Sequence, residues 1–283
     1  MAKPRKTRTA IIGGARTPFA RVASALRHHS ALDLSVHAVN AALSRTGLDP
    51  ARVDLLHHGI VVLDPRVPHM AREVALQSRL PAATRALTFT DNCITGISAM
   101  AAAVQSMALG HGRVAIAGGV ESMSNPPVMF SRAATRLLVD LGYTRDWQAR
   151  ARVLARFRPW HLKPQPPGIA EPSTGLSMGE HCELMVKEWG ISRGEQDALA
   201  LESHRRASAA MRDGRLAEEI AATADLDHDN LVRTDASAAR LAKLAPVFDR
   251  SEAGTITAGS SSPLTDGAAA VVLATAGALG TDD

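Results

Sequence analysis

The chain has 283 residues, 46% of them hydrophobic, and its 32 Lys and Arg residues against 28 Asp and Glu residues give a formal net charge of +4. No stretch approaches the ~20 consecutive apolar residues that a transmembrane helix needs, and the basic first ten residues lack the apolar segment of a secretory signal. The basic residues are dispersed, and only five Phe, one Tyr and three Trp are available for stacking, which argues against nucleic-acid binding.

We therefore expect a soluble, cytoplasmic protein whose length suits one large domain or two ordinary domains. The only cysteines, Cys93 and Cys182, lie far apart and form neither a metal-ligand spacing nor a disulfide framework. We expect both thiols to be reduced, and the cysteine spacing predicts no metal site.

The N-terminal half alternates predicted strands with predicted helices. Residues 31–46 carry apolar side chains at near-helical spacing and are followed by Gly47, a helix stop signal. Small residues from Cys93 to Leu109 predict a second helix. Short apolar runs predict strands at 10–13, 56–62, 87–90, 114–118, 255–258 and 268–274. Strands that alternate with helices predict a layered α/β fold.

The segment from residue 120 to residue 245 has a different pattern, with Gly and Pro punctuation between helical stretches. Ser192 and Glu195 form a capping box that opens the longest of these helices. We therefore predict a first domain made of residues 1–119 and 246–283, into which residues 120–245 are inserted as a mostly helical domain.

Basic side chains are concentrated between residues 145 and 163, beside Trp147, Phe157 and Trp160. The pattern favours an amphipathic, solvated surface helix. The alternative is a contact with the phosphates of a ligand such as coenzyme A, with a partner subunit or with a membrane surface.

Cys93 lies where the predicted strand at 87–90 turns into the following helix. Free N–H groups and the helix dipole at such a position favour the thiolate, which is a nucleophile. The alternative is a buried cysteine that acts as a small hydrophobic residue.

Three sequence blocks follow or precede this cysteine in a recognisable order. Residues 16–19 read Arg-Thr-Pro-Phe, residues 118–124 read Gly-Gly-Val-Glu-Ser-Met-Ser, and residues 257–270 read Thr-Ala-Gly-Ser-Ser-Ser-Pro-Leu-Thr-Asp-Gly-Ala-Ala-Ala. With Cys93, these blocks closely resemble the thiolase family over almost the whole chain. Residues 177–181 and 190–197 are most similar to its fatty-acid β-oxidation branch, the thiolase subunit of trifunctional-type complexes.

The resemblance implies a thiolase-like layered fold, a mixed sheet flanked by helices, with residues 120–245 as the loop domain over the substrate tunnel. It implies a 3-ketoacyl-CoA thiolase, an acetyl-CoA C-acyltransferase that moves an acyl group between a thioester on Cys93 and coenzyme A. Coenzyme A and acyl-CoA are then substrates, and no cofactor is bound permanently.

Two serines match, or fall near, family positions that contact coenzyme A. Ser262 corresponds to the serine whose hydroxyl contacts the pantetheine arm, whereas Ser260 stands where many thiolases have Asn. Simple turn chemistry is the alternative for both, because serine-rich loops before strands are common. The neighbouring glycines Gly118, Gly119, Gly259 and Gly267 are interpreted as serving tight turns and close packing.

The given sequence departs from the family at its end, because it reaches Asp283 shortly after the last predicted strand, and we expect the C-terminal thiolase domain to be absent. In the family that domain carries a Gly-His-Pro histidine and a Cys-x-Gly-Gly cysteine. We therefore expect a truncated or split chain, inactive alone, that forms a homo-oligomer or binds a partner chain supplying the missing domain. A hydratase/dehydrogenase subunit is a further possible partner.

Two other functions stay open. One is a non-catalytic thiolase-like interaction subunit, and the other is a ketoacyl-synthase-type condensing enzyme. No histidine lies in a matching catalytic motif, so surface or capping roles are expected for them: His28, His29, His57, His58, His111, His181 and His204. The neighbours His181 and Cys182 point in different directions on a helix and are not expected to share one site.

Overall fold

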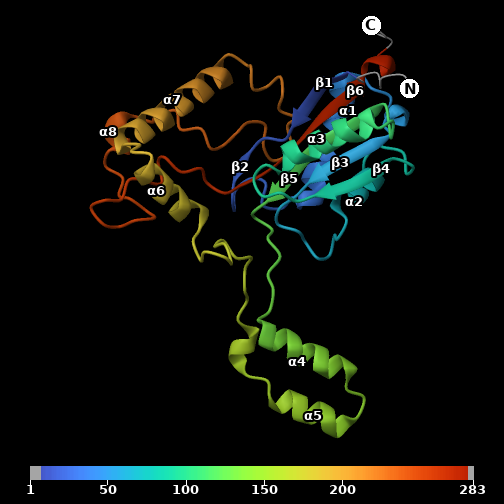
Figure 1. Cartoon of the computed structure of the whole chain (residues 1–283), viewed down its shortest axis with the longest axis vertical. Coiled ribbons are helices and arrows are strands. Elements are labelled where there is room, and N and C mark those ends of the chain that lie inside the picture. The colour runs from blue at the N-terminus through green and yellow to red at the C-terminus, as the bar shows by residue number, and fades with distance from the viewer. Residues whose placement is uncertain (1–7, 280–283) are drawn as a thin grey trace, which may run out of the picture.

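A computed structural model describes residues 8–279. Its centre is a single sheet with the strand order β1-β6-β5-β3-β4, in which β2 also pairs with β6 (Figure 1). β3 is parallel to β4 and β5, whereas β6 is antiparallel to β5 and β1, so the expected mixed sheet is confirmed. The strands are β1 Thr9–Arg16, β2 Ala20–Arg21, β3 Leu55–Gly59, β4 Arg85–Phe89, β5 Val114–Ser122 and β6 Thr265–Thr275.

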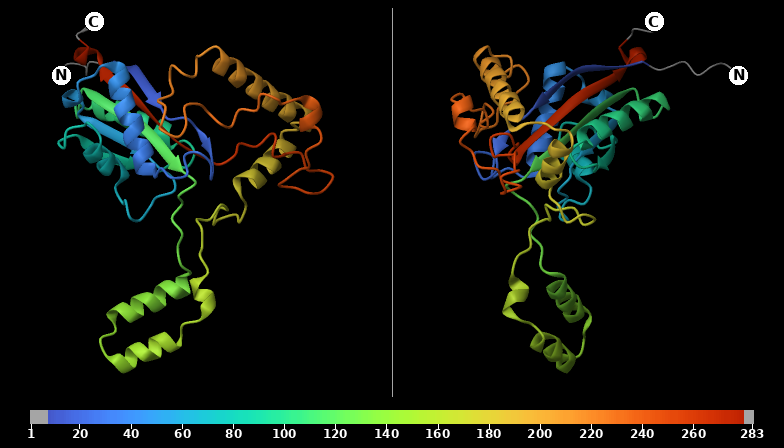
Figure 2. Two further views of the ribbon diagram at one scale, coloured as in Figure 1. Left: turned by 180° about the vertical axis from the view of Figure 1, so that it is seen from behind. Right: turned by 60° about the vertical axis from the view of Figure 1, so that its left-hand side comes forward.

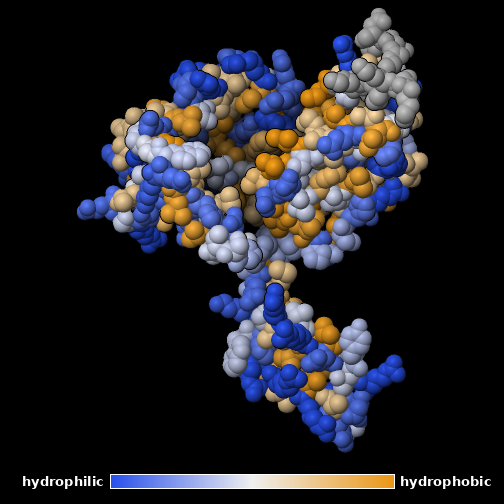
Figure 3. All heavy atoms as spheres, viewed as in Figure 1, coloured by the Kyte–Doolittle hydropathy of each residue, from blue (hydrophilic) through white to orange (hydrophobic). Residues whose placement is uncertain are grey.

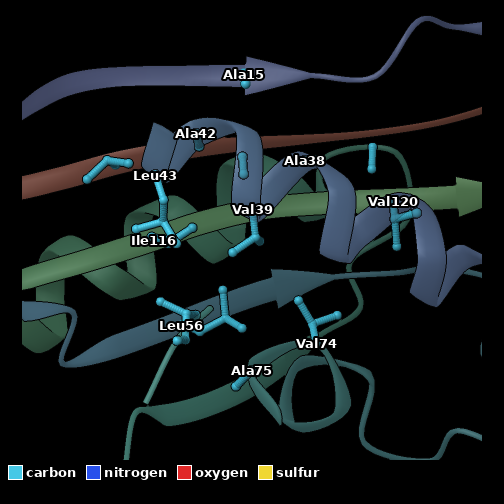
Figure 4. Close-up of a cluster of buried hydrophobic side chains, with 14 of the residues drawn as sticks. Ala15, Ala38, Val39, Ala42, Leu43, Leu56, Val74, Ala75, Ile116 and Val120 are labelled. Carbon is cyan, nitrogen blue, oxygen red and sulfur yellow. The ribbon is translucent and has the colours of Figure 1, made fainter. Parts of the chain in front are cut away.

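Helices cover both faces of the sheet. α1 (Ala31–Thr46) and α2 (Met70–Gln77) lie on one face and α3 (Thr95–Ala108) lies on the other. The side chains of β5 alternate between these layers: Ile116 joins the cluster under α1 and α2 in Figure 4, and Ala115 joins the one under α3. Burying one large aliphatic side chain contributes about 1.5–3 kcal/mol, so the alternation fixes which face of the strand each helix covers.

Helix α1 has the bounds that the sequence predicts. The Ser30 hydroxyl accepts from the Asp33 N–H, and the Asp33 carboxylate accepts from the Ser30 N–H, which closes a capping box at the first turn. Gly47 ends the helix in the left-handed conformation at φ 61°. Two short 3₁₀ turns flank the strands of the sheet. η1 (Pro50–Arg52) lies between α1 and β3, and η3 (Ala276–Ala278) follows β6.

The strand predicted at 255–258 is wrong. Among the described residues this segment makes only one isolated bridge, between Thr257 and Pro246. The buried carboxylate of Glu183 accepts from the N–H groups of Thr255 and Ile256, at 2.9 Å each. A side chain therefore takes the backbone donors that a neighbouring strand would otherwise satisfy.

The surface or capping roles expected for the histidines are wrong for His57 and His58. Both lie in β3 and are almost fully buried. Nε2 of His58 is 2.8 Å from the Ser35 hydroxyl on α1, and complete burial lowers the pKa of His58 to about 4. The His58 side chain is therefore a neutral component of the core at physiological pH.

A long excursion joins β5 to β6. Figure 1 and both views of Figure 2 show that α4 and α5 project away from the sheet, whereas α6, α7 and α8 lie beside it. The capping box predicted for Ser192 and Glu195 is present at the start of α7. The helical elements are α4 Arg132–Tyr143, α5 Trp147–Ala155, η2 Pro159–Leu162, α6 Met178–Glu188, α7 Arg193–Arg212 and α8 Ala238–Leu241.

Arg16, at the end of β1, holds one part of this excursion against the sheet. Its guanidinium donates to both carboxylate oxygens of Asp229, at 2.7 and 2.8 Å, and to Glu219. Such a bidentate ion pair fixes the relative orientation of the guanidinium and the carboxylate and also neutralises their charges. The division into a first domain and the inserted residues 120–245 stays a prediction.

Candidate active site

Cys93 lies in a tight turn between β4 and α3, and its side chain is exposed. The interpretation of Cys93 as a buried hydrophobic residue is therefore wrong. The helix begins at Thr95, two residues after the cysteine, and Asn92 adopts the left-handed conformation at φ 47°. Thr95 closes the turn, because its hydroxyl accepts from the Asp91 N–H at 2.7 Å and donates to the Asn92 carbonyl at 2.6 Å.

Glycines bring the start of α3 close to the sheet. A Cβ on Gly59, the last residue of β3, would lie 2.2 Å from the Thr95 methyl carbon. A Cβ on Gly119 of β5 would lie 3.4 Å from the Gly59 carbonyl oxygen and 3.8 Å from Cα of Gly96. The first residues of α3 can therefore pack closely against the end of β3 and against β5 at Gly119, because these glycines carry no side chain.

Glu121, in the Gly-Gly-Val-Glu-Ser-Met-Ser block, has a structural role that the sequence analysis did not single out. Its carboxylate accepts from the N–H groups of Val61 at 2.5 Å and Val62 at 3.2 Å. Burial raises the pKa of Glu121, and the two N–H donors act against that shift. The side chain therefore joins the loop after β3 to the end of β5.

The sequence blocks far apart in the chain meet at β6. Buried Asp266 accepts from the Ser124 N–H at 2.8 Å and from the Ser124 hydroxyl. Thr17, of the Arg-Thr-Pro-Phe block, accepts from the Ala268 N–H through its hydroxyl at 3.0 Å. The conformation at the ends of β1, β5 and β6 therefore depends on hydrogen bonds between the motifs.

Ser260 and Ser262 both line a cavity of about 1010 Å³ between α7, α8 and the loop before β6. The Ser260 hydroxyl accepts from the Thr257 N–H at 3.1 Å and so serves its own turn. The Ser262 side chain is exposed at the cavity wall and makes no hydrogen bond to any residue from 8 to 279. Ser262 is therefore the serine whose hydroxyl is available to a ligand.

The same cavity holds basic side chains that the sequence analysis missed. Arg21 and Arg233 line it, and neither guanidinium makes an ion pair or hydrogen bond within the described part of the chain. His204 also lines it, and burial together with the charge of Arg233 lowers the pKa of this histidine. These residues are dispersed in the sequence, so only folding shows that the two unpaired guanidinium groups and a neutral imidazole line one cavity.

A second cavity of about 520 Å³ adjoins the serine loop and is lined by α6, α7 and Phe248. Cys182 is one of its lining residues, whereas His181 on the same helix lies 3.0 Å from the Thr174 hydroxyl. Cys93 lines neither cavity. The structure thus places both serines in the cavity wall, whereas the exposed Cys93 is not among the residues that line either of these two cavities.

The comparisons with known proteins all point to the same family. Residues 9–277 match the family model for the thiolase N-terminal domain. The 3-ketoacyl-CoA thiolases of Serratia proteamaculans and Aeromonas salmonicida are 42% and 43% identical over 272 residues, which are 94% of this chain. That alignment spans 62% of the length of each of these curated relatives.

Solved structures show the same similarity in three dimensions. An acetyl-CoA acetyltransferase of Bacillus anthracis superposes with a TM-score of 0.81 at 26% identity, covering 98% of this chain and 68% of that one. Human mitochondrial 3-ketoacyl-CoA thiolase in complex with CoA superposes with a TM-score of 0.80 at 26% identity, covering 97% and 66%.

Proposed function

The chain belongs to the thiolase family through its N-terminal domain, and from this premise we propose that it serves as a 3-ketoacyl-CoA thiolase in fatty-acid β-oxidation. In this proposal Cys93 is the nucleophile and acyl carrier. The observation that carries the proposal is the exposed thiol in a turn that Thr95 closes and that leads into a helix packed closely against Gly59 of β3 and Gly119 of β5.

The proposed reaction has two acyl transfers. The Cys93 thiolate attacks the keto carbon of a 3-ketoacyl-CoA, the carbon–carbon bond breaks, and the departing acetyl-CoA carbanion takes up a proton. The shortened acyl chain remains as a thioester on the sulfur until the thiol of a second coenzyme A displaces it. A cysteine suits both steps, because its thiolate is a strong nucleophile and later a good leaving group.

We propose that coenzyme A lies in the cavity of about 1010 Å³, with its pantetheine arm along Ser262. The unpaired guanidinium groups of Arg21 and Arg233 supply positive charge for its phosphates. Ser260 is the weaker candidate for a ligand contact, since its hydroxyl already accepts a hydrogen bond from Thr257.

We further propose that residues 1–283 alone turn over little or no substrate. In residues 8–279 the Cys93 thiol makes no hydrogen bond with a general base, and a single acid–base group is typically worth ~10²–10⁴-fold in rate. The missing groups would come from a thiolase C-terminal domain, within a homo-oligomer or from a partner chain. Association with a hydratase/dehydrogenase subunit belongs to the same proposal.

Covalent acylation tests the assignment of Cys93 directly. The purified chain is incubated with a 3-ketoacyl-CoA or with acetyl-CoA, and intact-protein mass spectrometry followed by peptide mapping locates the acyl group. We expect the acyl group on Cys93, lost in Cys93→Ser and kept in the control Cys182→Ser. Acylation on Cys182, or acylation that persists in Cys93→Ser, would contradict the proposal.

A further inference from the structure

The walls of the cavity of about 1010 Å³ come from segments that lie far apart in the sequence. Arg21, from the short strand β2, contributes to one wall. Residues 231–233, in the connection between α7 and α8 (residues 213–237), contribute to another. Figure 3 shows the surface hollowed between this part of the excursion and the sheet. The two unpaired guanidinium groups of the cavity, on Arg21 and Arg233, therefore belong to segments that share no helix or strand.

Arg16, at the end of β1, joins these two segments. Its guanidinium donates to both carboxylate oxygens of Asp229, at 2.7 and 2.8 Å, and to Glu219 at 2.9 Å. The side chains of Arg16 and Asp229 are each only 12% exposed. Water screens such a pair weakly, and its two parallel hydrogen bonds fix the direction of the carboxylate. Asp229 is therefore held in one orientation against the end of β1.

Asp229 and its neighbour Asn230 bind the backbone that leads to Arg21. Oδ1 of Asp229 also accepts from the Phe19 N–H at 2.7 Å, and Oδ1 of Asn230 accepts from the Arg21 N–H at 2.8 Å. The Asn230 N–H donates to the Phe19 carbonyl at 3.3 Å. The backbone of Arg21 is therefore fixed to a residue that lies just before Arg233 in the chain.

Phe19 completes this contact on the side of the sheet. Cζ of Arg16 lies 4.7 Å from the centroid of the Phe19 ring, a cation–π distance. A Cβ on Gly267 of β6 would lie 2.3 Å from the same ring, so the ring packs directly on that strand. We call Arg16, Phe19, Asp229 and Asn230 the Arg16 cluster. It connects β1 and β6 to both segments that carry the unpaired arginines.

The Arg16 cluster acts on the cavity from outside. Arg16, Asp229 and Asn230 are not among the described residues that line the cavity, whereas Arg21 and Arg233 are. Two guanidinium groups bind a pair of phosphates well only when their spacing suits both, and ordering loose segments on binding costs affinity. A cluster that fixes both backbones in advance avoids that cost.

We propose that Arg16 is a positioning residue for the phosphates of coenzyme A. Through Asp229 and Asn230 it fixes the backbone at Arg21 and near Arg233, so that both guanidinium groups face the ligand before it binds. This inference rests on the function proposed above, which places coenzyme A in this cavity. It adds that coenzyme A affinity depends on an ion pair that the ligand does not touch.

Isothermal titration calorimetry of the full chain with coenzyme A tests the inference. Arg16→Gln should weaken binding about tenfold, and Arg21→Gln/Arg233→Gln should weaken it about a hundredfold. The triple variant should bind no more weakly than the double variant, because Arg16 acts only through the other two arginines. A further tenfold loss in the triple variant would show a general structural effect and overturn the proposal.

Arg45→Gln is the matched control, because it removes one arginine that holds the same connection elsewhere. The Arg45 guanidinium donates to the carbonyls of Glu218 and Ile220, and neither of these residues is among the described residues that line the cavity. This variant should bind coenzyme A like the unchanged chain. Equal losses in Arg16→Gln and Arg45→Gln would contradict a specific role of Arg16.

Asn230→Ala keeps the inference testable if Arg16→Gln does not fold. It leaves the ion pair in place and removes the acceptor of the Arg21 N–H. We expect a loss of about threefold in coenzyme A affinity, and no loss when Arg21 and Arg233 are already replaced by Gln. Unchanged affinity in Asn230→Ala would overturn the proposal.

The same measurements separate this inference from the function on which it rests. If the Arg21→Gln/Arg233→Gln variant loses affinity but Arg16→Gln does not, coenzyme A lies in the cavity and the positioning role of Arg16 is wrong. If the double variant binds as well as the unchanged chain, the proposed location of coenzyme A fails, and the inference fails with it. Absence of any coenzyme A binding by the unchanged chain would overturn both.

Discussion

Gly59 lies directly under Thr95: a Cβ at the end of β3 would come within 2.2 Å of the methyl carbon of the first residue of α3. The hydroxyl of the same threonine joins Asp91 and Asn92 on either side of the turn that presents Cys93. The position of the candidate nucleophile therefore depends on the absence of a side chain in a neighbouring strand.

We expect Gly59→Ala to destabilise the fold by about 1–3 kcal/mol, because an added methyl group overpacks this contact. It should also change the rate at which iodoacetamide alkylates Cys93. Gly96→Ala, in the first turn of the same helix, is the matched control, since a Cβ there meets nothing within 4 Å. Urea unfolding and alkylation kinetics measure the two effects, and equal stability of the two variants would contradict the packing argument.

Asp266 and Ser124 form the buried link between two sequence motifs. Replacing Asp266 by Ala leaves the Ser124 N–H without its acceptor, which should cost about 1–3 kcal/mol of unfolding free energy. Ser124→Ala removes only the hydroxyl donor and should cost less. A double-mutant cycle measured by chemical unfolding checks the coupling, and purely additive losses would show that the two residues act independently.

Glu183 holds the serine loop through Thr255 and Ile256. Burial alone would raise the pKa of this carboxyl, but the N–H and hydroxyl donors outweigh burial and lower it. Since the pKa of the folded state is below that of the unfolded state, the stabilisation is present at neutral pH and is lost as the pH falls through the acidic range. Glu183→Gln should therefore reduce the loss of unfolding free energy at acidic pH, as measured by unfolding at several pH values. A variant with the original pH profile would contradict the assignment.

Buried His58 should make the free energy of unfolding depend on pH in a second, higher pH range. Its pKa of about 4 in the fold lies below the ordinary value of 6.5, because its imidazole is completely buried. The unfolded chain takes up a proton first, so stability is full above pH 6.5 and falls as the pH drops towards 4. The loss should approach roughly 3 kcal/mol at 1.36 kcal/mol per pH unit. His58→Gln should remove this component between pH 6.5 and 4; an unchanged slope in that window would refute the prediction.

Local patterns predicted the secondary structure where a chain segment forms its own hydrogen bonds. Helix α1 has the predicted bounds because Ser30, Asp33 and Gly47 provide both ends within the segment. The segment at 255–258 was predicted wrongly because its backbone donors bind Glu183, a residue distant in sequence. His57 and His58 were misplaced for a related reason, since nothing local shows that β3 is covered on both faces.

The sequence by itself determined the family, the layered fold and Cys93 as the candidate nucleophile, since ordered motifs and hydrophobic periodicity are local properties of a chain. Tertiary structure alone decided which side chains line the same cavity. Arg21, His204 and Arg233 line one cavity with Ser262, while Cys93 does not line it. It also decided that the basic residues near 145–163 form one arm of a projecting hairpin. Such arrangements depend on contacts between segments that lie far apart along the chain, and no local pattern encodes them.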